Sequence, residues 1–406
     1  MVNNKFFRWS GLFFLIFATC VMTSHGALAE ERTEILIGAP LSLTGMLAMD
    51  GEEQQWAYEQ AVNDINKTGG IFVKEYGKKL PVKLVIADDE STSGQAAAAV
   101  EKLIKVNKVD LLLSTHSSPL TLPTCVTAEK YKKYYHATTI WPSLFLQQKF
   151  KWSTAFFFTA AGASEVPFKI FNHIPESERP KRIALLMEDS IDGQAFGGGF
   201  RASAEKYGYK YALDEPWAIG AKDYSSQILK AKARKADAMF IFGSPQDSIT
   251  LVRQMKEMGL NVKYLHGWKG TWTSEFWKAL GKDAQYVMCD GFWSEDFPYP
   301  GAKELGARFY KRFDKYSVST GLYYALAQIL WQAIERAGSV DSAKVRDAVV
   351  NNEFKGTVMG DVKYGPDGVA LSESTGNQWW DGKQRLVYPF SENSWKLRMA
   401  PPWDQR

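Results

Sequence analysis

A hydroxyl-rich loop with one histidine comes nearest to a catalytic motif in this sequence. Residues 114–118 read Ser-Thr-His-Ser-Ser and follow a short apolar run, residues 109–113. A serine beside a histidine could act as a nucleophile with its base, but a triad also needs an orienting carboxylate and an oxyanion hole. Hydroxyls bind ligands equally well, because they donate and accept hydrogen bonds without reacting. His116, Ser117 and Ser118 are therefore candidate binding residues, with a secreted hydrolase as the alternative.

Aromatic side chains gather in a second kind of loop, of which residues 266–272 are the sharpest example. The stretch reads His-Gly-Trp-Lys-Gly-Thr-Trp, so Lys269 lies between Trp268 and Trp272. Trp141 follows another predicted strand in a similar way. A single tryptophan usually packs beneath a long loop. Several together favour a ligand cleft with aromatic walls.

Signatures of the common enzyme classes are absent from the sequence. It contains no P-loop, HExxH, CxxC or GxSxG, and its five histidines show no metal-ligand spacing. Residues 197–202 fit GxGxxA, but they begin about ten residues after the nearest predicted strand and lack the strand-to-helix turn of a dinucleotide site. We therefore expect no catalytic residues, no metal and no cofactor.

The candidate loops need a scaffold that ends several strands at one edge. Residues 35–37 form an apolar strand, Ser42 lies in the following loop, and residues 52–65 have the apolar spacing of a helix. The same unit recurs over residues 82–139 and again from residue 182. This order is typical of doubly wound parallel sheets, in which ligands bind at the carboxyl ends of the strands.

The later part of the chain changes character. Residues 302–351 predict three helices, and residues 358–364 and 378–388 predict strands. Two similar lobes with such segments left over indicate a chain that crosses between lobes several times, which would make a hinge. A further helix is expected over residues 123–134, behind the hydroxyl-rich loop.

Residues 1–29 have the parts of a secretory signal peptide. Lys5 and Arg8 precede an apolar core at residues 11–19, and Ala-Leu-Ala at residues 27–29 fits a cleavage site. The core is too short to span a bilayer, which takes about 18 residues or more. Export to the periplasm is the prediction, with lipidation at Cys20 as the weaker alternative.

Net charge and cysteine content limit the partners and the covalent links that this protein could have. The net charge is +4 over 406 residues without a basic run, so nothing indicates a nucleic-acid partner. Cys125 and Cys289 could form a disulfide in an exported protein, or both could be buried thiols.

A series of motifs resembles one protein family. In chain order they are ILIGAPLSLTG, AVNDINKTGGI, LVIADDES, RIALLMEDS, DYSSQI, VKYGPDG and QWWDGKQRLVYP. They are similar to the periplasmic substrate-binding proteins of branched-chain-amino-acid-type ABC transporters, the leucine/isoleucine/valine-binding-protein-like group. The resemblance implies a type I periplasmic binding fold, with two Rossmann-like lobes joined by a three-crossover hinge. The first lobe would comprise residues 30–157 and 294–358, and the second residues 158–293 and 359–406.

The resemblance also implies ligand contacts on both lobes. On the first lobe they would be Ser117 or Ser118, Ala137, Thr138 and Thr139, with Met49 or Asp50 near the mouth of the cleft. On the second lobe they would be Asp192, Ser244, Gln246, Trp268 and Lys269. Ser42, His116 and Trp141 join this predicted site because they follow strands.

Lys269 departs from the family pattern. Members that bind α-amino acids carry a carboxylate in this loop, which pairs with the ligand's ammonium group. A lysine there would repel that group and would better suit a carboxylate on an aromatic or other flat, apolar body. If the alignment is off by a residue or two, Glu275 could supply the carboxylate instead.

The sequence as a whole predicts a non-enzymatic, monomeric receptor of an ABC importer. It would capture a small molecule, an aromatic or other carboxylate or an amino acid, and then dock on a permease in the inner membrane. The alternative with the same fold is the ligand-sensing module of a signalling system.

Overall fold

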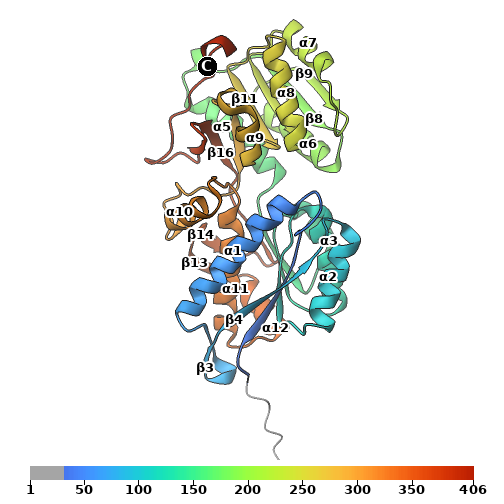
Figure 1. Cartoon of the computed structure of the whole chain (residues 1–406), viewed down its shortest axis with the longest axis vertical. Helices are drawn as coiled ribbons and strands as arrows, with labels where there is room; N and C mark the ends of the chain where they lie inside the picture. The colour runs from blue at the N-terminus through green and yellow to red at the C-terminus, as the bar shows by residue number, and fades with distance from the viewer. Residues whose placement is uncertain (1–31) are drawn as a thin grey trace, which may run out of the picture. The chain divides into compact units, whose positions relative to one another are not determined.

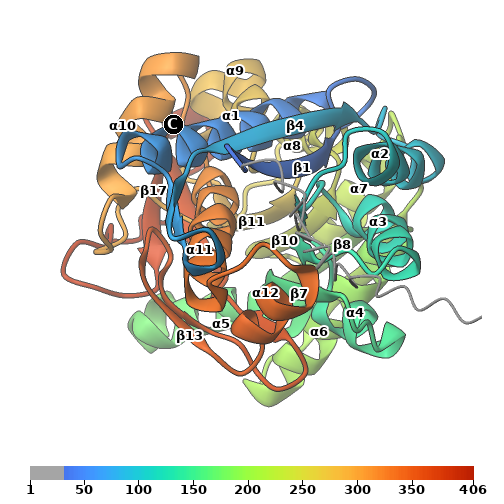
Figure 2. The ribbon, with the colours of Figure 1, turned by 90° about the horizontal axis from the view of Figure 1, so that it is seen from below.

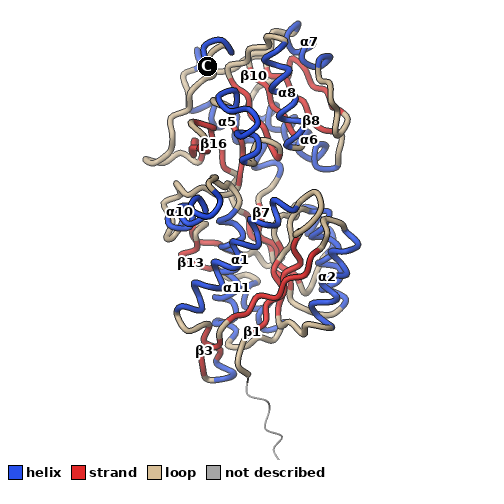
Figure 3. Tube along the Cα trace, in the orientation of Figure 1, coloured by secondary structure: helices blue, strands red, loops and turns tan. Residues whose placement is uncertain are grey.

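The computed structural model describes residues 32–406, and residues 34–406 form one compact unit. The predicted leader, residues 1–29, lies outside the described residues. Two large sheets organise the unit, and helices cover both faces of each (Figure 1, Figure 3). None of the helices within residues 32–406 combines the length and the hydrophobicity that a membrane span requires.

Six parallel strands make up the first sheet. In spatial order they are β15 (Val369–Leu371), β7 (Ser153–Phe157), β6 (Tyr135–Ala137), β5 (Leu111–Leu113), β1 (Ile35–Leu41) and β4 (Val82–Asp88). The central strands β5 and β6 are short and fully buried, as expected for parallel strands covered on both faces. The loops that follow these strands therefore emerge at one edge of the sheet.

The helices around the first sheet come from both ends of the chain. They are α1 (Ala48–Lys67), α2 (Ser93–Lys105), α3 (Ser118–Lys130), α4 (Pro142–Gln148), α10 (Ala302–Phe313), α11 (Thr320–Ala337) and α12 (Ser342–Val349). Figure 2 shows α2 and α3 side by side, while α1 packs along α11 (Figure 1). Two small hairpins complete this lobe: β2 (Ile71–Val73) with β3 (Lys78–Leu80), and β13 (Glu353–Thr357) with β14 (Gly360–Lys363).

Seven strands make up the second sheet. In spatial order they are β17 (Lys383–Tyr388), β16 (Thr375–Trp380), β12 (Met288–Gly291), β11 (Tyr264–Lys269), β10 (Ala238–Gly243), β8 (Ile183–Glu188) and β9 (Tyr211–Trp217). The pairs from β12 to β9 are parallel, whereas β16 and β17 are antiparallel additions. The helices are α5 (Ala160–His173), α6 (Ile191–Lys206), α7 (Ser225–Ala233), α8 (Pro245–Glu257) and α9 (Ser274–Leu280).

The chain passes between the two sheets three times, after β7, β12 and β15. We call the parts built on the two sheets the first and second lobes. The third passage lies at residues 372–374, not at the expected boundary after residue 358, because β15 pairs with β7. A strand of only three residues carries too little pattern to reveal its partner from sequence. Cys125 and Cys289 are buried free thiols, the second of the two alternatives.

Candidate ligand-binding site

A buried carboxylate ties together the loops at the carboxyl edge of the first sheet. Asp89 accepts a 2.7 Å hydrogen bond from Ser42 Oγ and another from Thr115 Oγ1. All three side chains are fully buried. The Ser42 hydroxyl therefore holds the loop after β1 to the loop after β4, so its role is structural and the prediction that it contacts a ligand is not supported. Asp89 was missed because its acidic run resembles an ordinary exposed turn.

The start of α3 carries the hydroxyl-rich loop. Ser117 is the residue before the helix, and its backbone N–H donates to Thr139 Oγ1 over 3.0 Å. Ser118 Oγ accepts from the Trp141 backbone N–H over 3.2 Å. Ser117 (φ 72°) and Thr139 (φ 51°) both adopt left-handed backbone conformations, which are strained for residues other than glycine and cluster at functional sites. Four predicted site residues from two loops thus lie together at one helix N-terminus.

The expected helix over residues 123–134 begins earlier, at Ser118, and contains Pro123. Proline has no N–H, so Pro123 leaves the carbonyl of Pro119 without its helical donor. Ser93 Oγ donates to that carbonyl over 3.0 Å and replaces the lost bond. A side chain from another helix therefore allows α3 to extend through the proline.

His116 does not assemble into a catalytic triad. Its Nδ1 lies 2.6 Å from the hydroxyl of Tyr323 in α11. Among residues 32–406, no carboxylate pairs with this histidine, so an orienting group for a nucleophile–base pair is missing. His116 instead connects the loop to the helix behind it.

The remaining first-lobe candidates differ in exposure. Ala137 and Thr138 are buried, and Thr138 Oγ1 donates to the Phe156 carbonyl over 2.7 Å. Met49 is exposed and Asp50 half-buried in the first turn of α1. Side chains at Met49 and Asp50 are thus accessible, whereas those of Ala137 and Thr138 belong to the strand end.

Trp141 and Asp192 meet across the two lobes. The indole Nε1 of Trp141 donates to Asp192 Oδ1 over 2.8 Å. The Trp141 ring also packs against Phe157 and Phe158 at the first passage and against Phe196 of α6, with centroids 5.2–5.5 Å apart. Two predicted site residues, one from each lobe, therefore form a direct contact.

Ser244 caps α8 and holds a buried acid. Its Oγ accepts from the Asp247 backbone N–H and donates to Asp247 Oδ2 over 2.7 Å. The Tyr224 hydroxyl donates to the other Asp247 oxygen, also over 2.7 Å. Gln246 is exposed at the start of the helix. Ser244 and Gln246 lie just after the carboxyl end of β10, and the Ser244 hydroxyl is already bonded.

Trp268 is a core residue, which corrects the prediction that it lines a cleft. It is fully buried, stacks on His266 at 3.9 Å and meets Phe200 at 4.5 Å between centroids. The strand β11 runs to Lys269, so Trp268 is a strand residue whose side chain points into the lobe. The sequence alone suggested that this stretch was a loop.

Lys269 has a partner that the sequence did not reveal. Its Nζ lies 2.6 Å from Glu188 Oε1, at the end of β8. Glu188 is buried as the last residue of strand β8. The positive charge predicted for this position is therefore paired.

Aromatic rings line the passages between the lobes. Phe158 stacks on Phe292 at 5.6 Å, and Trp272 meets Phe292 at 5.5 Å. The indole of Trp272 donates to Asp290, a fully buried residue whose pKa is raised well above its usual value by burial. Aromatic rings thus gather at the passages as well as around the buried Trp268.

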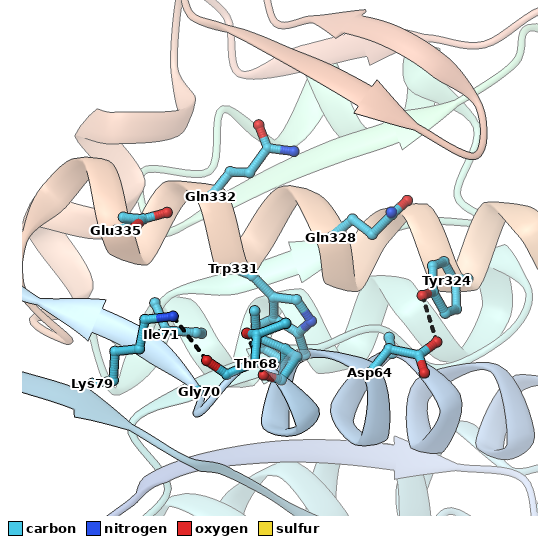
Figure 4. Close-up of a pocket in the computed structure, with 12 residues that line it drawn as sticks. Asp64, Thr68, Gly70, Ile71, Lys79, Tyr324, Gln328, Trp331, Gln332 and Glu335 are labelled. Carbon is cyan, nitrogen blue, oxygen red and sulfur yellow. Dashed lines mark hydrogen bonds between the residues drawn. The ribbon is translucent and has the colours of Figure 1, made fainter. Parts of the chain in front are cut away.

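A separate hollow of about 340 Å³ lies on the first lobe (Figure 4). It is bounded by α1, the β2–β3 hairpin and α11, with Trp331 and Tyr324 among its lining residues. None of the predicted site residues line it. Across the described part of the chain, no cluster of histidine, cysteine and acidic side chains could hold a metal ion.

Known proteins resemble this chain over most of its length. The profile of a family described as periplasmic binding protein matches residues 34–382. An amino acid binding protein from Pseudomonas aeruginosa is 27% identical over 384 residues, covering 94% of this chain and 98% of that protein. A "Leu/Ile/Val-binding protein BraC3" from Rhizobium johnstonii is 25% identical over 353 residues, which cover 86% of this chain and 92% of that protein.

Solved structures share the fold. The branched-chain amino acid transporter substrate binding protein LivJ from Streptococcus pneumoniae, in complex with isoleucine, matches with a TM-score of 0.74 and 21% identity, covering 87% of this chain and 98% of that one. A solute binding protein of an ABC transporter from Rhodopseudomonas palustris, in complex with 3,4-dihydroxy benzoic acid, matches with a TM-score of 0.71 and 19% identity. The match covers 87% of this chain and 95% of that one. The predicted fold class is confirmed, and the chain belongs to the periplasmic binding protein family.

Proposed function

We propose that this protein is the extracytoplasmic solute-binding receptor of an ABC importer. The Trp141–Asp192 contact carries the proposal, because it joins the carboxyl edges of both sheets, where open α/β folds bind ligands. The names of the relatives and of the matching structures support it, since they describe amino acid binding proteins and transporter binding proteins.

The first lobe would hold the polar head of the ligand. Ser117, Ser118 and Thr139 lie at the N-terminus of α3, where the helix dipole favours a carboxylate. The loops after β8, β10 and β11 would cover the rest of the ligand. An amino acid or an aromatic carboxylate has such a head, which agrees with the isoleucine and dihydroxybenzoate bound by two structural relatives.

The three passages would act as the hinge. The first lobe would move against the second. The first comprises the residues up to 157 and residues 294–371, and the second comprises residues 158–293 and 375–406. A ligand shifts the open–closed equilibrium only if it binds the closed form more tightly. The closed, monomeric receptor would then dock on a permease in the inner membrane, after export and removal of residues 1–29.

A thermal-shift screen of residues 30–406 tests the proposal. The compounds are aliphatic amino acids, aromatic carboxylates, amides and dicarboxylates. A ligand at 100 times its dissociation constant adds about 2.7 kcal/mol of stability, which raises the melting temperature clearly. The ligand must be recovered unchanged and bind one-to-one. Turnover of an ester or amide that is lost in Ser117→Ala would instead support the hydrolase, and no stabilisation by any compound would contradict a receptor.

A further inference from the structure

Glu188 and Lys269 form an ion pair whose two partners differ sharply in exposure. Lys269 Nζ and Ser190 Oγ both donate to Glu188 Oε1, over 2.6 and 2.8 Å. The Glu188 side chain is 1% exposed, whereas that of Lys269 is 39% exposed. Among the described residues, none donates to Glu188 Oε2. The carboxylate therefore lies behind the ammonium group, and the lysine is the partner that meets solvent at this edge of the sheet.

The pair adjoins the contact between the lobes. Ser190, which donates to Glu188, also caps α6 by accepting from the Gly193 backbone N–H over 2.9 Å. Asp192, in the first turn of the same helix, accepts the hydrogen bond from Trp141 of the first lobe. A ligand held between the lobes would thus lie within reach of the lysine.

The other charges at this edge are negative. At the ends of β8, β10, β11 and β12, in the loops that follow them and in the first turns of α6, α8 and α9, Lys269 is the one basic residue. The acids there besides Glu188 are Asp189, Asp192, Asp247, Glu275, Asp290, Glu295 and Asp296. Asp247 accepts from Tyr224 and Ser244, and Asp192 accepts from Trp141. A ligand carboxylate would find one cation, already paired, among several carboxylates. A ligand ammonium group would lie against the lysine itself and be repelled.

We propose that Glu188 sets the charge specificity of the site by neutralising Lys269. The ligand end that faces β11 is then an uncharged group, a hydroxyl or carboxamide, that accepts a hydrogen bond from the lysine. Glu188 acts through Lys269 and is a positioning residue. This inference rests on the proposed function, and it deepens it by specifying the chemistry of one end of the ligand.

Two matched ligand series test the inference by titration calorimetry. On a benzoate body, the para substituent is hydroxyl, methyl, carboxylate or aminomethyl. On an α-amino acid body, the members are glutamine, norleucine, glutamate and ornithine. In whichever series binds, we expect the uncharged polar member to bind about tenfold more tightly than either charged member. A carboxylate or ammonium member that binds most tightly would overturn the inference, as would no binding in both series.

Variants separate charge specificity from a structural role. Glu188→Gln leaves Lys269 unpaired, so the carboxylate member should gain about tenfold over the uncharged one. Lys269→Gln leaves Glu188 unpaired, so the aminomethyl or ornithine member should gain instead. Asp283→Asn removes an exposed ion pair with Lys256 in the same lobe and should leave the ranking of the ligands by affinity unchanged. An unchanged order in both site variants overturns the inference, while the receptor function itself is judged by the broader thermal-shift screen.

Discussion

The indole of Trp141 in the first lobe donates a 2.8 Å hydrogen bond to Asp192 in the second lobe, 51 residues further along the chain. Around it, the indole ring packs on Phe157, Phe158 and Phe196. The bond joins the lobes directly, so it exists only when they are close together.

Loss of this bond should weaken ligand binding. Trp141→Phe keeps an aromatic ring but removes the donor, and a hydrogen bond to a carboxylate contributes enough that affinity should fall about five- to tenfold. Calorimetric titration with the ligand found in the screen measures the effect. Trp403→Phe is the control, because its indole donates to Leu260 away from the lobe contact. Equal affinities in the two variants would show that the bond does not stabilise the closed form.

Removal of the Thr139 hydroxyl should impair binding more than folding. Thr139→Val has a similar shape but loses the acceptor for the Ser117 N–H and the donor to the Thr115 carbonyl. We expect affinity to fall about tenfold or more and unfolding free energy to fall by about 1 kcal/mol. Urea unfolding and titration measure both. Thr127→Val, which removes a bond within α3, should leave affinity unchanged; a loss of affinity there would point to a general effect on the helix.

The Glu188–Lys269 pair should have an asymmetric effect on stability. Lys269→Gln leaves a buried carboxylate without its cation, which should lower the unfolding free energy by about 2 kcal/mol. Glu188→Gln leaves a half-exposed lysine that water can solvate, so its cost should be smaller. Lys256→Gln, in an exposed pair, should cost about 0.5 kcal/mol or less. Urea unfolding that gives Glu188→Gln the larger loss would contradict this account of the burial.

Acid should destabilise the first lobe through His136. This residue is fully buried, its Nε2 lies 2.6 Å from the Tyr364 hydroxyl, and burial lowers its pKa from 6.5 to about 3. The unfolded chain takes up the proton more readily than the folded protein. The stability that neutral His136 contributes is thus present above pH 6.5 and is lost as the pH falls toward 3.

The test compares unfolding free energies of wild type and His136→Gln at pH 7 and pH 4. The wild-type loss should exceed that of the variant by about 3 kcal/mol, since Gln takes up no proton. His173→Gln changes an exposed histidine and should follow wild type. Parallel losses in wild type and His136→Gln would mean that other groups govern acid unfolding.

Much of the scaffold could be predicted from the sequence. Buried strands such as β5 and β10 read as apolar runs, and the polar residues after them mark the carboxyl edge of each sheet. Local periodicity is enough for this, since every parallel strand ends at the same edge of its sheet. The family resemblance, rather than this pattern, named Ser117, Thr139 and Asp192 as ligand contacts, and the structure shows that each of them closely follows a strand.

The sequence by itself therefore determined the two α/β lobes and the loops that follow their strands. Only the tertiary structure decided which side chains are available there. Trp268 packs into the core because it lies within strand β11, which runs to Lys269, and Lys269 pairs with Glu188, 81 residues away. The burial of Trp268 and the pairing of Lys269 depend on which strands are neighbours and on which face of the sheet each side chain lies. Packing over the whole lobe sets both, and a local sequence pattern does not.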